Sequence, residues 1–204
     1  MSVLLQKVED FVTKQYSRSV WNDFDYHNLE HTLNVVKEAR DLAIRSNLPN
    51  NIVETIEIAA WFHDLGYEYG VEGHELKSFE LAKKFLSKEG ATLLLIEEVG
   101  NLIQATSIGF ERFQSLSQKI MRDADLSNAG LKGFKKCSNA LRREWATKMN
   151  QEYDDIGWAN LQIHYLSNLS YLSESANDKY SKRKRKNLKK YKKRLLKKQR
   201  ELVH

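Results

Sequence analysis

Proline and cysteine are almost absent from this sequence: its 204 residues include one of each, together with nine glycines. A single cysteine, Cys137, cannot form an intramolecular disulfide, so a buried core has to stabilise the chain. The longest apolar runs, such as residues 91–96, are far shorter than the roughly 20 residues of a membrane-spanning helix, and we predict no membrane span. The segment MSVLLQKVEDFV has acidic residues where a signal peptide needs a basic and then an apolar stretch, so we expect a cytoplasmic protein.

Charged residues are distributed unevenly along the chain. Residues 1–110 carry 10 Lys and Arg against 17 Asp and Glu, residues 111–178 carry 9 of each kind, and residues 179–204 carry 14 against 1. The overall charge of +6 therefore belongs to the C-terminal segment, which carries +13, and not to the body of the protein. We predict one domain over residues 1–178 and a separate basic segment over residues 179–204.

The sequence also lacks alternating runs rich in Val, Ile and Thr, and its apolar residues recur at helical spacing instead. This pattern predicts an all-α fold, a helical bundle with a long basic C-terminal helix. The expected helices cover residues 3–16, 28–46, 50–62, 75–88 and 91–106, a short helix through Ile120, and two longer helices within residues 135–172. Asn28 is a plausible N-cap of the second helix.

Histidines and acidic residues gather at the ends of these expected helices, and four of the six histidines fall within residues 27–74. His27 and His31 are four residues apart and share a helix face. A divalent metal takes imidazole nitrogen and carboxylate oxygen together, and several helices can each supply one or two such ligands. For any single histidine, a hydrogen-bonded core or capping role is the simpler interpretation.

Considered in order, these residues match the pattern of a known family. His31 lies in YHNLEHT, the pair His63-Asp64 lies in AAWFHDLGY, and Asp125 lies in RDADLSNAG. This order of His, adjacent His-Asp and distant Asp resembles the HD superfamily of metal-dependent phosphohydrolases. The likeness extends over most of the chain to a bacterial group of predicted HD-superfamily phosphohydrolases, whose later features resemble RREW at residues 142–145 and RKNL at residues 185–188.

The resemblance implies an enzyme that hydrolyses a phosphate ester or anhydride of a small, nucleotide-like metabolite. It implies a divalent ion (Mn, Fe, Co, Ni, Zn or Mg) held by His31, His63, Asp64 and Asp125, with Asp64 bridging to a second metal in dinuclear members. His74 is the candidate ligand at a second metal. Dinuclear members carry one more histidine before the last Asp, which the segment QATSIGF at residues 104–110 lacks, and this favours a single metal or a weak second site.

Other residues are candidates with a simpler alternative beside each. Glu68 is a candidate catalytic base or water-orienting group, or else a solvated acid. Arg18 and Arg122 are candidate phosphate ligands, or else ordinary surface or ion-paired arginines. The family group often has an Arg just before its Tyr-His, where this chain has an aspartate. We expect His27 to support the ligands or to have a structural role, and Asp123 to support Asp125 or to cap the local turn, rather than to bind metal.

The basic segment has a narrow apolar seam of Leu188, Tyr191, Leu195 and Leu202. The seam is expected to pack on the domain or on a partner subunit in a homo-oligomer. The alternatives are phosphate contacts with nucleic acid, an anionic membrane surface, and the acidic body of the chain. Two other functions stay open: a catalytically inactive metal- or nucleotide-binding regulatory domain, and a nucleic-acid-associated protein that binds through the tail.

Overall fold

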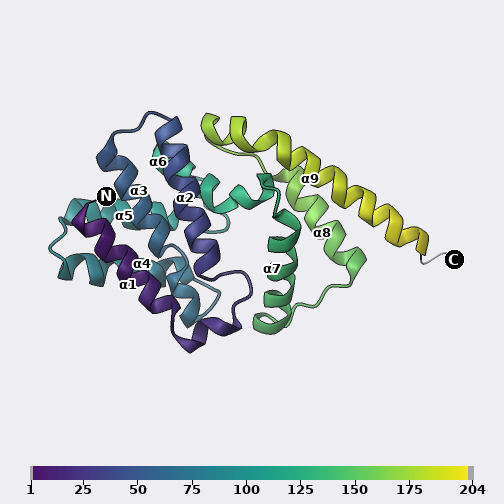
Figure 1. The fold of residues 1–204 in the computed structure, drawn as a ribbon, viewed down its shortest axis with the longest axis horizontal. Helices are drawn as coiled ribbons and strands as arrows, with labels where there is room; N and C mark the ends of the chain where they lie inside the picture. The colour runs from purple at the N-terminus through teal and green to yellow at the C-terminus, as the bar shows by residue number, and fades with distance from the viewer. Residues whose placement is uncertain (1, 202–204) are drawn as a thin grey trace. The chain divides into compact units, whose positions relative to one another are not determined.

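The computed structural model describes residues 2–201 and confirms the all-α fold. Within this range the chain forms nine α-helices, three short 3₁₀ helices and no strand (Figure 1). Contacts divide the chain into two compact units, one ending at Asp125 and the other beginning at Leu126. None of the described helices combines the length and the hydropathy that crossing a bilayer requires.

The first unit is built around one central helix that is buried throughout its C-terminal half. Its elements are α1 (Val3–Tyr16), η1 (Ser19–Asp23), α2 (Leu29–Arg45), α3 (Asn50–Phe62), η2 (Leu65–Tyr69), α4 (His74–Lys88), α5 (Leu93–Gln104) and α6 (Leu116–Asp125). Helix α3 contacts α1, α2, α4, α5 and α6, and every residue from Thr55 to Phe62 is buried. A helix that is buried on every side over two turns lies at the centre of a bundle. Its C-terminal end therefore places the next two residues, His63 and Asp64, in the interior.

Most of these helices have the bounds that the sequence predicts. Helices α1 and α3 occupy the predicted ranges, and α2, α4 and α5 begin and end within two residues of them. The predicted end of the sixth helix at Ile120 is wrong, because α6 continues to Asp125. Met121 and Ala124 are buried like Ile120, so the apolar stripe runs on for another turn. Asp123 and Asp125 consequently lie in the last turn of α6 rather than after it.

The second unit contains η3 (Leu126–Gly130), α7 (Phe134–Lys148), α8 (Asp155–Asn168) and α9 (Glu174–Glu201). Helix α9 packs on α8 and on η3, and α8 and α9 lie side by side in Figure 1. Tyr191 belongs to the core of this unit, with Phe134 and Leu166, and Leu188 and Leu195 pack against that core. Three residues of the predicted seam therefore face the interior of the unit. Leu202 lies outside the described residues.

Two close contacts attach α9 to η3. Asn187 is buried, and its Nδ2 donates hydrogen bonds of 2.9 Å to the carbonyl oxygens of both Ala129 and Leu131. At Gly130, an added Cβ would lie 2.3 Å from Cβ of Tyr180, so only glycine fits there. The boundary predicted between residues 178 and 179 falls inside α9, because the composition changes there without a break in the helix.

Candidate metal centre

Two histidines of the first unit, one on α2 and one directly after α3, lie close together with their rings tilted to each other. The Asn28 side chain caps α2 by accepting a hydrogen bond from the His31 backbone N–H, which fixes His31 in the first turn of the helix. His63 follows the buried end of α3. Their Nε2 atoms are 3.3 Å apart, and both side chains are buried. Residues distant in sequence are thus brought together by the packing of α2 on α3.

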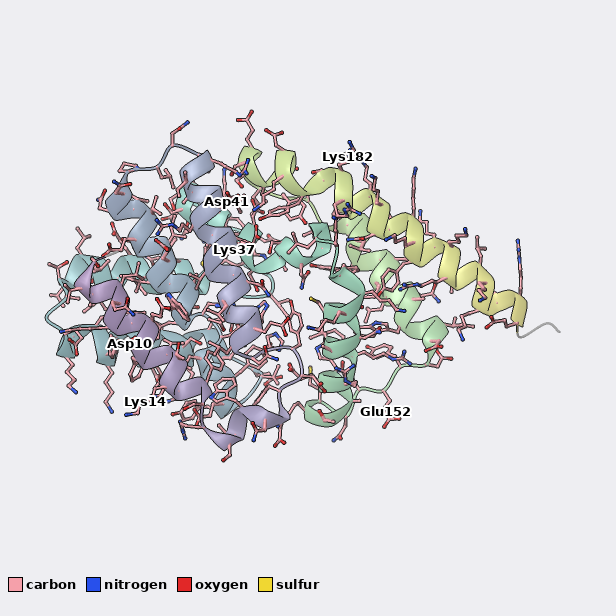
Figure 2. The ribbon with its side chains drawn as sticks, in the orientation of Figure 1. Asp10, Lys14, Lys37, Asp41, Glu152 and Lys182 are labelled. Carbon is pink, nitrogen blue, oxygen red and sulfur yellow. The ribbon has the colours of Figure 1, made fainter. Side chains whose placement is uncertain are left out.

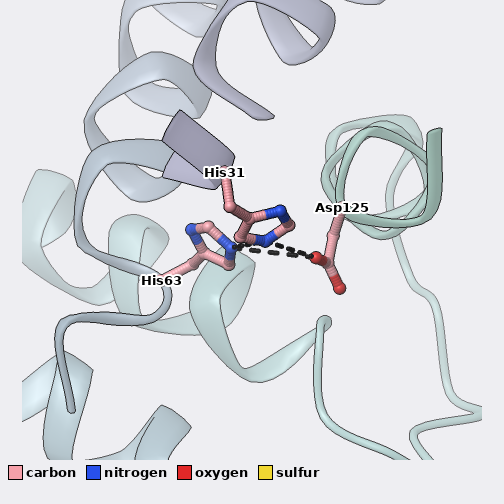
Figure 3. Close-up of side chains that lie close together, drawn as sticks. All are labelled: His31, His63 and Asp125. Carbon is pink, nitrogen blue, oxygen red and sulfur yellow. Dashed lines mark hydrogen bonds and ion pairs between the residues drawn. The ribbon is translucent and has the colours of Figure 1, made fainter. Parts of the chain in front are cut away.

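Asp125 completes the group from the last turn of α6. Its Oδ1 lies 3.4 Å from Nε2 of His31 and 3.7 Å from Nε2 of His63 (Figure 3). The ligand atoms of His31, His63 and Asp125 all lie within 4.8 Å of one another. The Asp125 side chain is 19% exposed, against 7% for His31 and 0% for His63. Asp125 is therefore the member of the group that is most accessible to a molecule from solvent.

Asp64 lies beside the same two imidazoles. Its Oδ2 is 3.1 Å from Nε2 of His31 and 3.1 Å from Nε2 of His63, and its Oδ1 is 3.5 Å from Nε2 of His74. Nevertheless, the buried Oδ2 atom accepts no hydrogen bond from any residue in the described part of the chain. A buried carboxylate oxygen of this kind is costly unless a cation neutralises it.

Backbone carbonyls determine which nitrogen of two of the imidazoles carries the proton. Nδ1 of His63 donates to the carbonyl oxygen of Ala60 at 2.8 Å, and Nδ1 of His74 donates to that of Val71 at 2.8 Å. Since a carbonyl only accepts, each Nδ1 bears a hydrogen, and in the neutral ring Nε2 keeps its lone pair. In both residues Nε2 is the atom that faces Asp64, as a metal ligand requires.

The shifted pKa values of His31, Asp64 and Asp125 show that this site stabilises positive charge. Burial lowers the pKa of His31, but the carboxylates of Asp125 and Asp64 outweigh burial and raise it to about 10. Burial raises the pKa of Asp64, but the imidazoles around it outweigh burial and hold that pKa well below its usual range. The pKa of Asp125 is likewise lowered, because contacts with His31 and His63 outweigh burial. Carboxylates that favour a proton on His31 also favour a metal cation beside it.

Five of the six separations among the four candidate ligand atoms are close to those expected around a single metal ion. Ligand atoms at about 2.0–2.2 Å from one ion are separated by about 3.0 Å at right angles and by about 3.4 Å at tetrahedral angles. The five measured separations among these ligand atoms run from 3.1 to 3.7 Å. Two imidazole nitrogens and two carboxylate oxygens form a set that first-row divalent ions accept.

Comparison with known families agrees with this geometry. The family model described as HD domain matches residues 28–129, a range that contains His31, His63, Asp64 and Asp125. The chain belongs to the HD domain family. No curated protein and no solved structure matches it. The HD domain match does not test the likeness to a bacterial group of predicted phosphohydrolases, which stays a prediction.

Two of the other predicted site residues are paired with each other. Nη2 of Arg18 lies 2.6 Å from Oε1 of Glu68, and Nη1 donates to Oε2 at 2.8 Å. The Glu68 side chain is 11% exposed and that of Arg18 is 51% exposed, so the pair runs from the interior to the surface. The candidate base and a candidate phosphate ligand therefore neutralise each other in this structure.

Arg122 and Asp123 lie on α6 next to the candidate ligand Asp125. Nη1 of Arg122 donates to the carbonyl oxygen of Thr106 at 3.1 Å and is 3.9 Å from Oδ2 of Asp125. The backbone contact holds the guanidinium beside the exposed side of the metal group. Asp123 is buried, at 1% exposure.

The sequence pattern predicts no role for Tyr67, which ends the segment HDLGY. The Tyr67 ring stacks on the His27 ring, with centroids 3.9 Å apart, and lies 4.0 Å from the His74 ring. It thus joins two predicted site histidines that are far apart in sequence. In the sequence, the position of Tyr67 three residues after Asp64 is the feature that could have indicated its place beside these histidines.

Proposed function

We propose that this HD domain protein is a metal-dependent phosphohydrolase that acts on an ester or anhydride of a small, nucleotide-like phosphate compound. One observation carries the proposal: His31, His63 and Asp125 come from three helices and converge with their ligand atoms within 4.8 Å. HD domains are generally metal-dependent hydrolases, and this chain contains residues suited to hold the metal.

The ligands in this proposal are His31, His63, Asp64 and Asp125. A bound divalent ion supplies Lewis acidity, polarising a phosphoryl oxygen and making water a better nucleophile near neutral pH. The residues themselves fix its position, because the Ala60 carbonyl orients His63 and the Asn28 cap holds His31 in place. Since both carboxylates stay ionised, they also offset the charge of the ion.

The substrate is proposed to approach from the side of Asp125 and Arg122. These are the exposed parts of the group, at 19% and 23% of their side-chain surfaces. The Arg122 guanidinium is held by Thr106 and is suited to bind a phosphate oxygen there. Arg18 can provide a second phosphate contact if it leaves Glu68, and its departure would free the Glu68 carboxylate to accept a proton from water.

His74 is proposed as the ligand of a second, weaker metal site. Its Nε2 faces Oδ1 of Asp64, whereas Nε2 of His31 and of His63 face Oδ2. The two oxygens of Asp64 are thus divided between two sets of imidazole nitrogens, as a bridging carboxylate requires. The segment 104–110 supplies no further histidine, so we expect the site of His31 and His63 to fill first.

The test compares the wild-type protein with His63→Ala and with His164→Ala as a matched control. His164 is exposed on α8 and contacts Asn168. Metal content is measured by mass spectrometry, and hydrolysis is assayed on nucleotides, phosphomonoesters and phosphodiesters with Mn²⁺, Fe²⁺, Co²⁺, Ni²⁺, Zn²⁺ and Mg²⁺. His63→Ala should lower metal content and reduce turnover by more than about a hundredfold, while His164→Ala changes neither.

Two outcomes would contradict the proposal. If the wild-type protein retains no metal and none of the six ions produces turnover, the enzyme assignment fails. If it binds a nucleotide in a manner that depends on His63 but hydrolyses nothing, the protein is a regulatory HD domain instead.

A further inference from the structure

A cavity of about 730 Å³ lies in the second unit, between α7, α8 and α9. Its walls contain no residue of the candidate metal centre. This volume is within the range of about 300–1,000 Å³ that small-molecule sites occupy. The cavity is therefore a different site from the candidate metal centre, and any ligand that it binds has a role of its own.

The lining of the cavity carries an excess of positive charge. Six cationic residues line it (Lys135, Arg142, Arg143, Arg194, Lys197 and Lys198). Three carboxylates line it as well: Glu152, Asp155 and Glu201. Glu152, labelled in Figure 2, belongs to the connection between α7 and α8 and is exposed. The formal charge of the lining is thus positive by three.

Some of these cations are already neutralised, and others are not. Asp155 pairs with Arg142 at 2.9 Å and with Lys198 at 3.3 Å, which lowers the pKa of its carboxyl. Glu201 pairs with Lys198 at 3.4 Å and with Lys197 at 3.7 Å. Lys135 and Arg194, by contrast, form no ion pair with any residue between 2 and 201. Their charges are available to a ligand.

The walls that carry these cations are fixed before any ligand arrives. Ser138 Oγ accepts hydrogen bonds of 2.9 Å from both Trp158 Nε1 and Tyr191 Oη, which ties α8 and α9 to α7. Arg142 Nε donates to the Tyr153 carbonyl at 3.0 Å and holds the connection before α8. Arg194 lies over the Tyr191 ring at 5.2 Å, which orients its guanidinium. A guanidinium that is oriented in advance, as at Arg194, binds an anion with little loss of conformational entropy.

We propose that this cavity binds a small ligand that carries a chain of phosphate groups, with Lys135 and Arg194 as the cations that contact it. A lining with a surplus of three positive charges matches several linked phosphates better than one phosphate. A guanidinium and an ammonium are both suited to phosphate oxygens. Only three of the fourteen cations in residues 179–204 line the cavity, so a polyanion that bound along α9 would use a different surface.

The test measures binding of inorganic tripolyphosphate to the full chain by calorimetry, with a chelator present and about 150 mM salt to screen surface charges. The variant Lys135→Gln/Arg194→Gln removes the two proposed contacts. The matched control Lys186→Gln/Lys190→Gln removes two charges from exposed positions of α9 that do not line the cavity. Circular dichroism and the thermal midpoint establish that both variants are folded, and Arg194→Lys tests whether charge alone suffices.

We expect the wild-type protein and the control to bind tripolyphosphate equally, with a dissociation constant below about 1 mM, and the cavity variant to bind at least about tenfold more weakly. Equal weakening in both double variants would overturn the proposal, and so would binding only of single-stranded RNA or of anionic lipid vesicles. Loss of binding in His63→Ala would also overturn it, because the phosphate would then occupy the metal centre. Failure of the hydrolase assays leaves these outcomes unchanged, so the two proposals fail separately.

Discussion

At the residue scale, Gly66 determines how closely η2 approaches the start of α4. Its backbone N–H donates to Ser78 Oγ at 2.8 Å, and a Cβ at this position would lie 2.1 Å from the carbonyl oxygen of His74. It would also lie 2.7 Å from the backbone nitrogen of Ser78. Because these neighbours are backbone atoms, they cannot rotate away. The glycine of HDLGY therefore holds the Asp64 segment and His74 at their mutual distance.

Gly66→Ala should lower the free energy of unfolding by about 3 kcal/mol, at the upper end of the cost of overpacking. Urea-induced unfolding followed by circular dichroism measures this loss. Gly133→Ala is the control, since Gly133 has a φ of −75° and nothing within 4 Å of its Cβ position. We expect the control to change stability by less than about 1 kcal/mol. A similar loss in both variants would show that steric exclusion at Gly66 is not the cause.

At the element scale, the three long helices of the second unit meet at one hydroxyl group. Ser138 on α7 accepts from Trp158 on α8 and from Tyr191 on α9, and all three side chains are buried. The long helix α9 is otherwise polar over most of its surface, with only a narrow seam in the core. Such a helix owes its position to a few buried contacts, among them those of Asn187 and Tyr191.

Ser138→Ala should destabilise the protein by about 3 kcal/mol, because it leaves two buried donors without an acceptor. Adding Tyr191→Phe removes one of those donors, so the double variant should lose less than the sum of the two single variants. Thermal and urea unfolding of the four proteins gives the coupling. Ser167→Ala, at an exposed position of α8, should be neutral. Strict additivity of the two changes would contradict the shared-acceptor interpretation.

At the scale of the whole molecule, charge of opposite sign is concentrated in two different parts of the chain. Residues 1–110, which contain most of the candidate metal ligands, carry a net charge of −7, whereas residues 179–204 carry +13. Negative charge around His31 and His63 favours a metal cation, and the positive lining in the second unit favours an anion. The isoelectric point near 9.2 averages these two environments and describes neither.

A metal ion that binds the folded protein should raise its thermal midpoint in proportion to the logarithm of metal concentration. At one hundred times the dissociation constant the gain is about 2.7 kcal/mol. Differential scanning fluorimetry with Mn²⁺ measures it, and His63→Ala should remove most of the effect while His164→Ala retains it. Equal stabilisation of both variants would place the metal elsewhere on the protein.

Local patterns in the sequence were sufficient for much of the fold. The bounds of α1 and α3 follow from apolar periodicity and from end signals such as Pro49, which act within a few residues. The wrong end of α6 shows the limit of this reasoning, since burial of Met121 and Ala124 against the bundle extended the helix. The candidate ligands His31, His63, Asp64 and Asp125 could also be found in the sequence, because the family pattern is an order of residues along the chain.

Tertiary structure alone decided how these parts meet. The separations of 3.1–3.7 Å among the ligand atoms depend on the packing of α2, α3 and α6, which no local pattern specifies. The same holds for the pairing of Arg18 with Glu68, 50 residues apart, and for the division of the chain after Asp125. The cavity of the second unit was invisible in a charge count, because the count could not distinguish α9 cations that face the cavity from those that face solvent. The sequence determined which metal-binding and charged side chains the protein has, and long-range packing determined which of them lie close together.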